Sequence, residues 1–103
     1  FNMTQIFKPG VKLSSKVCKT QIMVLRIPAI ELEIFCGGLP MEVGDPDVLG
    51  EIQGENNGTL VGKRYTDETE TMEFLCTRGG EGSISVSGHK IDIKAAKKLP
   101  SSD

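Results

Sequence analysis

The chain has no tryptophan and a single histidine, and aromatic residues make up only 5% of its 103 residues. Proteins that bind nucleic acid usually combine a positive surface with aromatic side chains that stack on bases. The formal net charge here is −2 at pH 7, so nucleic acid is not expected as a partner. No apolar run approaches the roughly 20 residues that span a bilayer, so no membrane partner is expected either.

The number of cysteines is odd, so they cannot all be paired in disulfides within the chain. The chain has three cysteines, Cys18, Cys36 and Cys76, and no basic and apolar signal is recognised at its start. Small secreted domains usually carry paired cysteines. We therefore expect a cytoplasmic protein whose thiols stay reduced or bind metal. Phe1 and Asn2 precede Met3 and are expected to be remnants, with Met3 as the native start.

Glycine, in contrast, is abundant, with 12 residues. Each glycine weakens a helix interior by about 1 kcal/mol, so the composition favours turns over long helices. We expect residues 3–103 to form a single all-β domain, a small barrel or two-layer sandwich of about six or seven strands built from hairpins. Residues 95–103 are expected to be a frayed tail, in which Pro100 stops any helix.

Two strands are expected in the first third of the chain. Residues 17–27 are rich in β-branched and apolar side chains, and Pro28 ends this run. Residues 31–36 begin with a regular alternation of charged and apolar side chains, which is typical of a half-buried strand. The two strands are predicted to form a hairpin that brings Cys36 back toward Cys18.

Residues 59–94 are expected to consist of hairpins. A polar turn separates strands predicted at 59–65 and 71–77. Residues 83–86 and 90–93 alternate around a short turn with glycine, and this is the strongest local pattern in the chain. The apolar side chains expected to face inward from this last hairpin are Ile84, Val86, Ile91 and Ile93.

Two glycine-rich segments are expected to be loops. Residues 42–58 are acidic as well, which is compatible with a recognition loop or with a solvated insertion; the composition favours the insertion. Residues 79–82 contain three glycines but lack the lysine and the following helix of a phosphate-binding loop. Phosphate binding is therefore not expected there.

The most specific sequence signal lies in residues 15–41, which contain Ser15-Lys16-Val17-Cys18 and Phe35-Cys36-Gly37-Gly38-Leu39-Pro40-Met41. A cysteine followed by glycines can form a tight turn that directs a thiolate at a metal. This stretch resembles the desulforedoxin-like domain, a small rubredoxin-related iron module with a Cys-x-x-Cys knuckle and a closing Cys-Cys-Gly-x-Pro/Asp-Met. Ser15 and Phe35 stand where two family ligands are expected, so only Cys18 and Cys36 carry over. The resemblance therefore implies an ancestral metal knuckle rather than a present iron centre.

Three uses of the cysteines remain open. Cys18, Cys36 and Cys76, with or without His89, could bind zinc or iron. Cys18 and Cys36 could form a disulfide or a redox pair. All three could be small buried hydrophobic residues, which is the commonest fate of a free cysteine. His89 follows the predicted turn of the last hairpin and is expected to be exposed at its tip.

The sequence shows no catalytic set and no cofactor fingerprint. We therefore expect a non-catalytic accessory or binding module, without a cofactor, that contacts a protein partner or a second copy of itself. The alternative is a small thiolate metalloprotein, with structural zinc or electron-carrying iron on the cysteines and His89. An enzyme with Cys36 or Cys76 as its nucleophile would instead need a stabilised thiolate in a cleft.

Overall fold

The computed structural model describes residues 4–48, 50–54, 56–87 and 89–94. Within these residues the chain forms β-strands and no helix, so none of them belongs to a helix that could cross a membrane. The expectations for residues 1–3 and 95–103 lie outside this description.

Twelve short strands are present among the described residues, more than the six or seven expected. They are β1 (Gln5–Ile6), β2 (Lys12–Ser14), β3 (Gln21–Arg26), β4 (Glu31–Leu32), β5 (Ile34–Cys36), β6 (Leu39–Pro40), β7 (Glu42–Val43), β8 (Arg64–Thr66), β9 (Glu73–Arg78), β10 (Ile84–Val86), β11 (His89–Lys90) and β12 (Asp92–Ile93).

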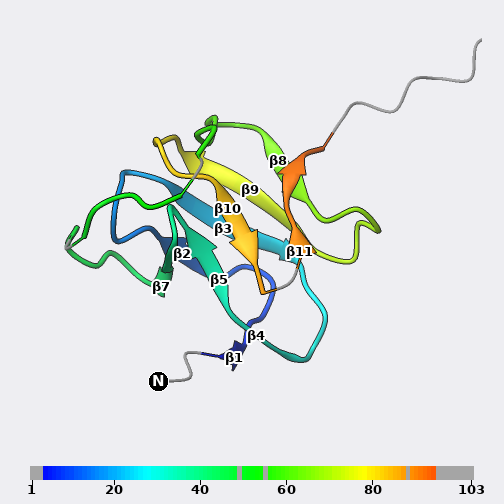
Figure 1. Ribbon diagram of the computed structural model, residues 1–103. Coiled ribbons are helices and arrows are strands. Elements are labelled where there is room, and N and C mark those ends of the chain that lie inside the picture. Colours follow the sequence, from blue (N-terminus) through cyan, green and yellow to red (C-terminus); the bar gives the residue numbers. More distant parts are fainter. Residues whose placement is uncertain (1–3, 49, 55, 88, 95–103) are drawn as a thin grey trace, which may run out of the picture.

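The strands form three antiparallel sheets. A six-stranded sheet has the order β12-β8-β9-β3-β2-β7, and a four-stranded sheet has the order β11-β10-β5-β6. The short strands β1 and β4 form a separate pair. In Figure 1, β5 and β10 lie in front of β3 and β9, so the two larger sheets are layered. The predicted all-β fold is confirmed, in its sandwich-like form rather than as a closed barrel.

The core lies between the two larger sheets, because alternate residues of their strands point toward each other. Ile22 and Val24 on β3 are fully buried, as is Phe74 on β9. Ile34 of β5 and Ile84 of β10 close the core from the other sheet. The apolar alternation that predicted strands in the sequence is therefore the pattern that fills this core.

The predicted hairpin of residues 17–27 and 31–36 is wrong. β3 pairs with β2 and β9, whereas β5 pairs with β6 and β10 in the other sheet. Between them the chain passes through β4, which pairs with β1. Alternation shows which face of a strand is buried but not which strand lies beside it, so the partners were assigned wrongly.

The two C-terminal hairpins are present, but they differ from the prediction at the start of the first and at the end of the second. In residues 59–63, which were predicted as strand, Thr59 forms only an isolated bridge and residues 61 and 62 form a turn. β8 pairs with β9, and β10 pairs with β11 through Val86 and His89. The chain then changes sheets, because β12 pairs with β8 instead of continuing along β10. Ile91 is buried as expected, but Ile93 is 45% exposed. The inward orientation expected for Ile93 is therefore wrong.

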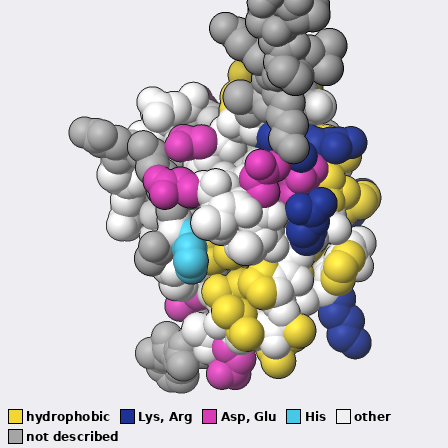
Figure 2. All heavy atoms as spheres, turned by 90° about the vertical axis from the view of Figure 1, so that its right-hand side faces the viewer, with side chains coloured by type: hydrophobic (Ala, Val, Ile, Leu, Met, Phe, Trp, Pro, Cys, Tyr) yellow, Lys and Arg dark blue, Asp and Glu magenta, His cyan; other side chains and the backbone are white. Residues whose placement is uncertain are grey.

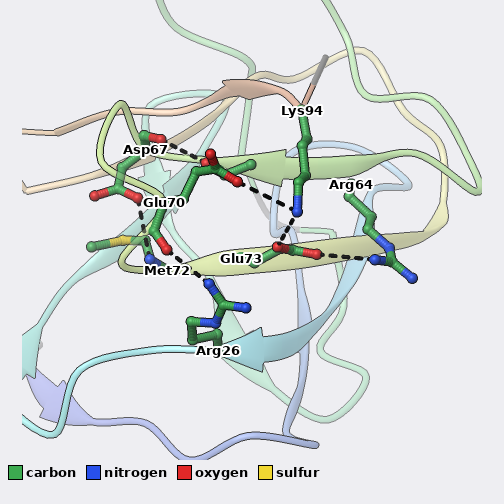
Figure 3. Close-up of polar contacts among 8 residues, drawn as sticks. Arg26, Arg64, Asp67, Glu70, Met72, Glu73 and Lys94 are labelled. Atoms are coloured by element: carbon green, nitrogen blue, oxygen red, sulfur yellow. Dashed lines mark hydrogen bonds and ion pairs between the residues drawn. The ribbon is translucent and has the colours of Figure 1, made fainter. Parts of the chain in front are cut away.

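A charged cluster, Arg26, Arg64, Asp67, Glu70, Glu73 and Lys94, lies beside the β8–β9 hairpin (Figure 3). Glu73 is buried, and its carboxylate lies 3.1 Å from Nζ of Lys94 and 3.4 Å from Nη1 of Arg64. The hydrogen bond from Lys94 is the main cause that lowers the pKa of Glu73. Figure 2 shows acidic and basic side chains side by side on one face of the molecule.

Asp67 closes the turn of the same hairpin. Its carboxylate accepts hydrogen bonds from the hydroxyls of Thr69 and Thr71, at 3.0 and 2.6 Å, and from the backbone N–H of Met72 at 3.1 Å. Burial raises the pKa of Asp67, but these hydrogen bonds outweigh burial and the net shift is downward. The charged form of Asp67 therefore stabilises the turn.

Candidate functional site

Cys18 lies in a tight loop that joins β2 to β3. The Oγ of Ser15 accepts hydrogen bonds from the backbone N–H groups of Val17 and Cys18, at 3.1 and 3.2 Å. The loop is closed where the N–H of Ser15 donates to the carbonyl of Thr20 at 2.9 Å. This arrangement holds the sulfur of Cys18 3.3 Å from Ser15 Oγ and 3.3 Å from Thr20 Oγ1.

Cys36 lies at the end of β5, in the other sheet. The turn after it uses Gly37 and Gly38 with φ of 64° and 92°, a conformation that glycine adopts without steric cost. Cys36 is fully buried, and its Sγ lies 3.8 Å from Sγ of Cys18. The two sulfurs therefore meet between the sheets, although their strands do not pair.

Two glycines of the segment 79–82 make room for these sulfurs. A Cβ atom at Gly82 would lie 2.9 Å from Sγ of Cys36 and 3.1 Å from Sγ of Cys18. A Cβ at Gly80 would lie 3.2 Å from Sγ of Cys18 and 2.6 Å from the backbone nitrogen of Thr20. These contacts are too short for any larger residue, so the glycines are needed where the chain passes the thiols.

The two thiols differ in acidity. Burial raises the pKa of Cys18, but hydrogen bonds from Ser15, Thr20 and the backbone of Gly82 outweigh it and lower the pKa to about 7. For Cys36, burial and the neighbouring charge of Cys18 raise the pKa to about 12. At neutral pH the pair therefore holds one readily formed thiolate beside one protonated thiol.

A short chain of hydroxyl groups leads away from Cys18. Thr20 Oγ1 lies 2.5 Å from Thr59 Oγ1, and both threonines are buried. A thiol has one proton to donate, so it cannot donate to Ser15 and Thr20 together. The hydroxyl that does not accept this proton is placed to donate to the sulfur, which favours the thiolate.

The other two predicted ligands differ in position: Cys76 interacts electrostatically with Cys18, whereas His89 is exposed. Cys76 is buried on β9, where its thiol donates to the carbonyl of Arg78 at 3.1 Å and burial raises its pKa. His89 lies on β11 and is exposed, as predicted, and Figure 2 shows the histidine at the surface. Among the described residues, no three His, Cys, Asp or Glu side chains are close enough to hold a metal ion. Metal binding by the four predicted residues stays a prediction.

Sequence reasoning selected Cys18 and Cys36 but missed the residues that support them. Thr20 and Thr59 are separated by 39 positions, and both belong to unremarkable polar stretches. The one available signal was the set of glycines in 79–82, which the sequence explained only as a loop. Small residues beside an isolated cysteine can indicate a close approach of two chain segments.

An open groove of about 710 Å³ is the second candidate feature. Its floor includes the buried side chains of Tyr65, Ile84 and Ile91, while Leu60 and Ile93 are 56% and 45% exposed at its sides. The residues that line it are Gly38, Gln53, Asn56, Asn57, Gly58, Leu60, Tyr65, Ser83, Ile84, Ser85, Ile91, Asp92 and Ile93.

Part of the acidic loop forms one wall of this groove. The side-chain amide of Asn56 donates to the carbonyl of Gln53 at 3.0 Å, and its Oδ1 accepts from the N–H of Ser83 at 2.9 Å. The hydroxyl of Ser83 also accepts from the N–H of Asn57 at 2.6 Å. These bonds attach the end of the predicted solvated insertion to the segment before β10.

Comparison with known proteins gave no match, whether with family models, curated proteins or solved structures. The desulforedoxin-like resemblance of residues 15–41 therefore remains a prediction from those residues alone. The function must be argued from the groove and from the thiols.

Proposed function

We propose that the protein is a non-catalytic binding module that acts through protein contacts, and that its groove takes an extended segment of a partner protein. The observation that carries this proposal is the groove of about 710 Å³, whose walls combine apolar and uncharged polar side chains. Binding sites in proteins commonly have a volume in this range.

The chemistry of the walls favours a polypeptide as the occupant. The side chains of Asn57 and Ser85 make no hydrogen bond to other described residues, and they can pair with the N–H and C=O groups of an extended backbone. Leu60 and Ile93 are about half exposed, so apolar side chains of the segment would cover them. Asp92 is the one charged residue among the described residues of the groove, which disfavours a highly charged ligand.

The position of β12 also supports a peptide. Within the described chain, β12 is the end strand of the six-stranded sheet, and both of its residues line the groove. Sheets often bind extended peptides by adding them beside an end strand, with side chains entering alternate pockets. The partner segment would therefore alternate between apolar and polar residues.

Selection of peptides from a random display library against the full chain tests this function. We expect alternating apolar and polar peptides that bind the wild type, and that bind a Leu60→Asp/Ile93→Asp variant at least about tenfold more weakly. Val43→Asp is the matched control, because Val43 is 58% exposed on β7 and does not line the groove. Equal binding to the wild type and the double variant would exclude the groove.

Two other occupants give different results in the same experiments. If sedimentation shows a dimer that the Leu60→Asp/Ile93→Asp variant cannot form, the groove binds a second copy of the chain. If the selected peptides bind only a truncated variant that lacks residues 95–103, those residues occupy the groove in the full chain. Either result would overturn the proposal of a partner segment.

A further inference from the structure

We propose that Cys18 and Cys36 form a redox-active dithiol that exchanges electrons with low-molecular-weight disulfides by closing a disulfide between the two sheets. The observation that carries this inference is the 3.8 Å separation of their sulfur atoms, which come from a loop of one sheet and the end of a strand of the other. It is independent of the groove and of the binding function proposed for it.

A short movement of the two sulfurs is enough to form the bond. A disulfide has an S–S distance of about 2.05 Å, so the sulfurs must approach each other by about 1.8 Å. Cys18 lies in a loop rather than a strand, which lets its side chain move without breaking sheet pairing. Gly80 and Gly82 carry no side chains that would block the approach.

The two thiols have different roles in the exchange. Cys18 is partly exposed and Cys36 is fully buried, so an external disulfide reaches Cys18 first. Ser15 Oγ and Thr20 Oγ1 each lie 3.3 Å from the sulfur of Cys18. Once that sulfur is deprotonated, both hydroxyls can donate to it, so Ser15 and Thr20 are positioning residues for the thiolate. The pKa of Cys18, lowered to about 7, supports its role as the attacking sulfur.

The exchange takes two steps. The Cys18 thiolate attacks one sulfur of a disulfide R–S–S–R; a Cys18–S–R bond forms, and one thiolate leaves and takes a proton from water. Cys36 then loses its proton to water and attacks the sulfur of Cys18, which releases the second R–S⁻. Two electrons pass from the protein dithiol to the external disulfide, and the reverse steps with two thiols reduce the protein again.

Reaction with the chromogenic disulfide 5,5′-dithiobis(2-nitrobenzoic acid) tests the mechanism, in full-length protein treated with EDTA and carrying Cys76→Ala. We expect two thionitrobenzoate ions per protein, no thionitrobenzoate left on the chain, and a tryptic fragment in which Cys18 is bonded to Cys36. The further substitution Cys36→Ser should release one ion and leave the other on Cys18. The Cys76→Ala substitution serves only to remove the third thiol from the count. The same tryptic fragment is therefore also sought in wild-type protein after incubation with oxidised glutathione.

Three results would overturn the inference: a stable mixed disulfide on Cys18 while Cys36 is present, reaction of Cys18 no faster than that of unfolded protein, or wild-type protein without the Cys18–Cys36 fragment. The last measurement needs no substitution, so it decides the matter even if a cysteine variant fails to fold.

The pH dependence of the first step tests the positioning residues separately. The rate at Cys18 should rise with a midpoint near pH 7. Ser15→Ala and Thr20→Val should move this midpoint upward and slow the reaction about tenfold at pH 7, because the hydroxyls that stabilise the thiolate are lost. Thr77→Val is the matched control, since its hydroxyl donates to the carbonyl of Gln21 and is not bonded to either thiol. An unchanged midpoint in both variants would exclude the positioning role.

Discussion

In the charged cluster, the carboxylate of Glu73 faces the ammonium of Lys94 and the guanidinium of Arg64, whereas the sulfur of Cys18 in the thiol site faces hydroxyl groups. Both regions hold an ionisable group partly or wholly out of water. A neighbouring cation neutralises a buried charge, while a hydroxyl stabilises the charge and leaves it in place. The cluster is therefore suited to stabilising the fold, and the thiol site retains a nucleophile.

The largest expected loss of stability follows from a substitution in the charged cluster. Asp67→Ala removes three hydrogen bonds and leaves the N–H of Met72 buried without a partner. The free energy of unfolding should fall by about 3 kcal/mol, measured by urea denaturation followed by circular dichroism. Asp45→Ala is the control, because Asp45 is exposed and accepts one long hydrogen bond; it should change stability by less than about 0.5 kcal/mol. Similar losses in both variants would contradict the role given to Asp67.

The second effect is on the thiol site. Gly82→Ala places a methyl group against both sulfurs and should cost about 2 kcal/mol of unfolding free energy. Combining it with Cys36→Ala removes one of the two clashing sulfurs. The double variant should therefore be more stable than the sum of the single losses predicts, in the same urea measurement. Strictly additive losses would mean that Gly82 is needed for a reason other than the thiols.

A smaller loss should appear on acidification. The folded-state pKa values of Asp67 and Glu73 are lowered, so their stabilisation is present above their unfolded pKa values, near 3.8 and 4.5, and is lost as pH falls through the folded values. The urea midpoint should thus decrease below about pH 4.5. Glu73→Gln should flatten this decrease, whereas Glu51→Gln, at an exposed position, should not. A midpoint independent of pH between 3 and 6 would contradict the ion pairs of Figure 3.

The rates at which the thiols react with a labelling reagent give a further test of the thiol site. This test needs no substitution and does not depend on stability. Iodoacetamide at pH 7 should label Cys18 at least about tenfold faster than Cys76, because Cys18 is partly exposed and its pKa is lowered whereas that of Cys76 is raised by burial. Mass spectrometry of tryptic fragments after timed labelling measures both rates. Equal rates would show that the hydroxyl groups do not stabilise the Cys18 thiolate.

The smallest expected effect is that of a chelator. If the protein works without a cofactor, EDTA should leave the urea midpoint unchanged, and elemental analysis should find much less than one zinc or iron per chain. About one equivalent of metal, lost together with the fold in Cys36→Ser, would instead support the predicted metal site of Cys18, Cys36, Cys76 and His89.

Much of the local structure was predictable from the sequence. The alternation in residues 83–86 and the turn after it predicted the β10–β11 hairpin, and the polar turn after residue 65 predicted the β8–β9 hairpin. These pairings are local, so periodicity and turn residues are sufficient to identify them. The expected partner of β3 was wrong, because β3 pairs with the preceding strand β2 and with β9, which lies about 50 positions away. Ile93 was misplaced because the chain changes sheets after β11.

The candidate site was predictable only in part, for the same reason. A cysteine before two glycines drew attention to Cys36, and the Ser15–Cys18 spacing drew attention to Cys18. Neither pattern contained Thr59, which contacts Thr20 from a distant segment, or Gly82, which passes beside both sulfurs. No local pattern showed that Leu60 and Ile93 would border one groove.

By itself the amino-acid sequence determined that this chain is built of strands, where most of them lie, and which residues could carry thiol chemistry. Those properties follow from the period of apolar residues and from turn residues, and both act over a few neighbouring positions. Only the tertiary structure decided which strands pair and that Cys18 and Cys36 meet. Contacts between residues that are distant in the sequence depend on how the whole core packs and on the entropy lost in closing long loops. No short stretch of sequence contains that information.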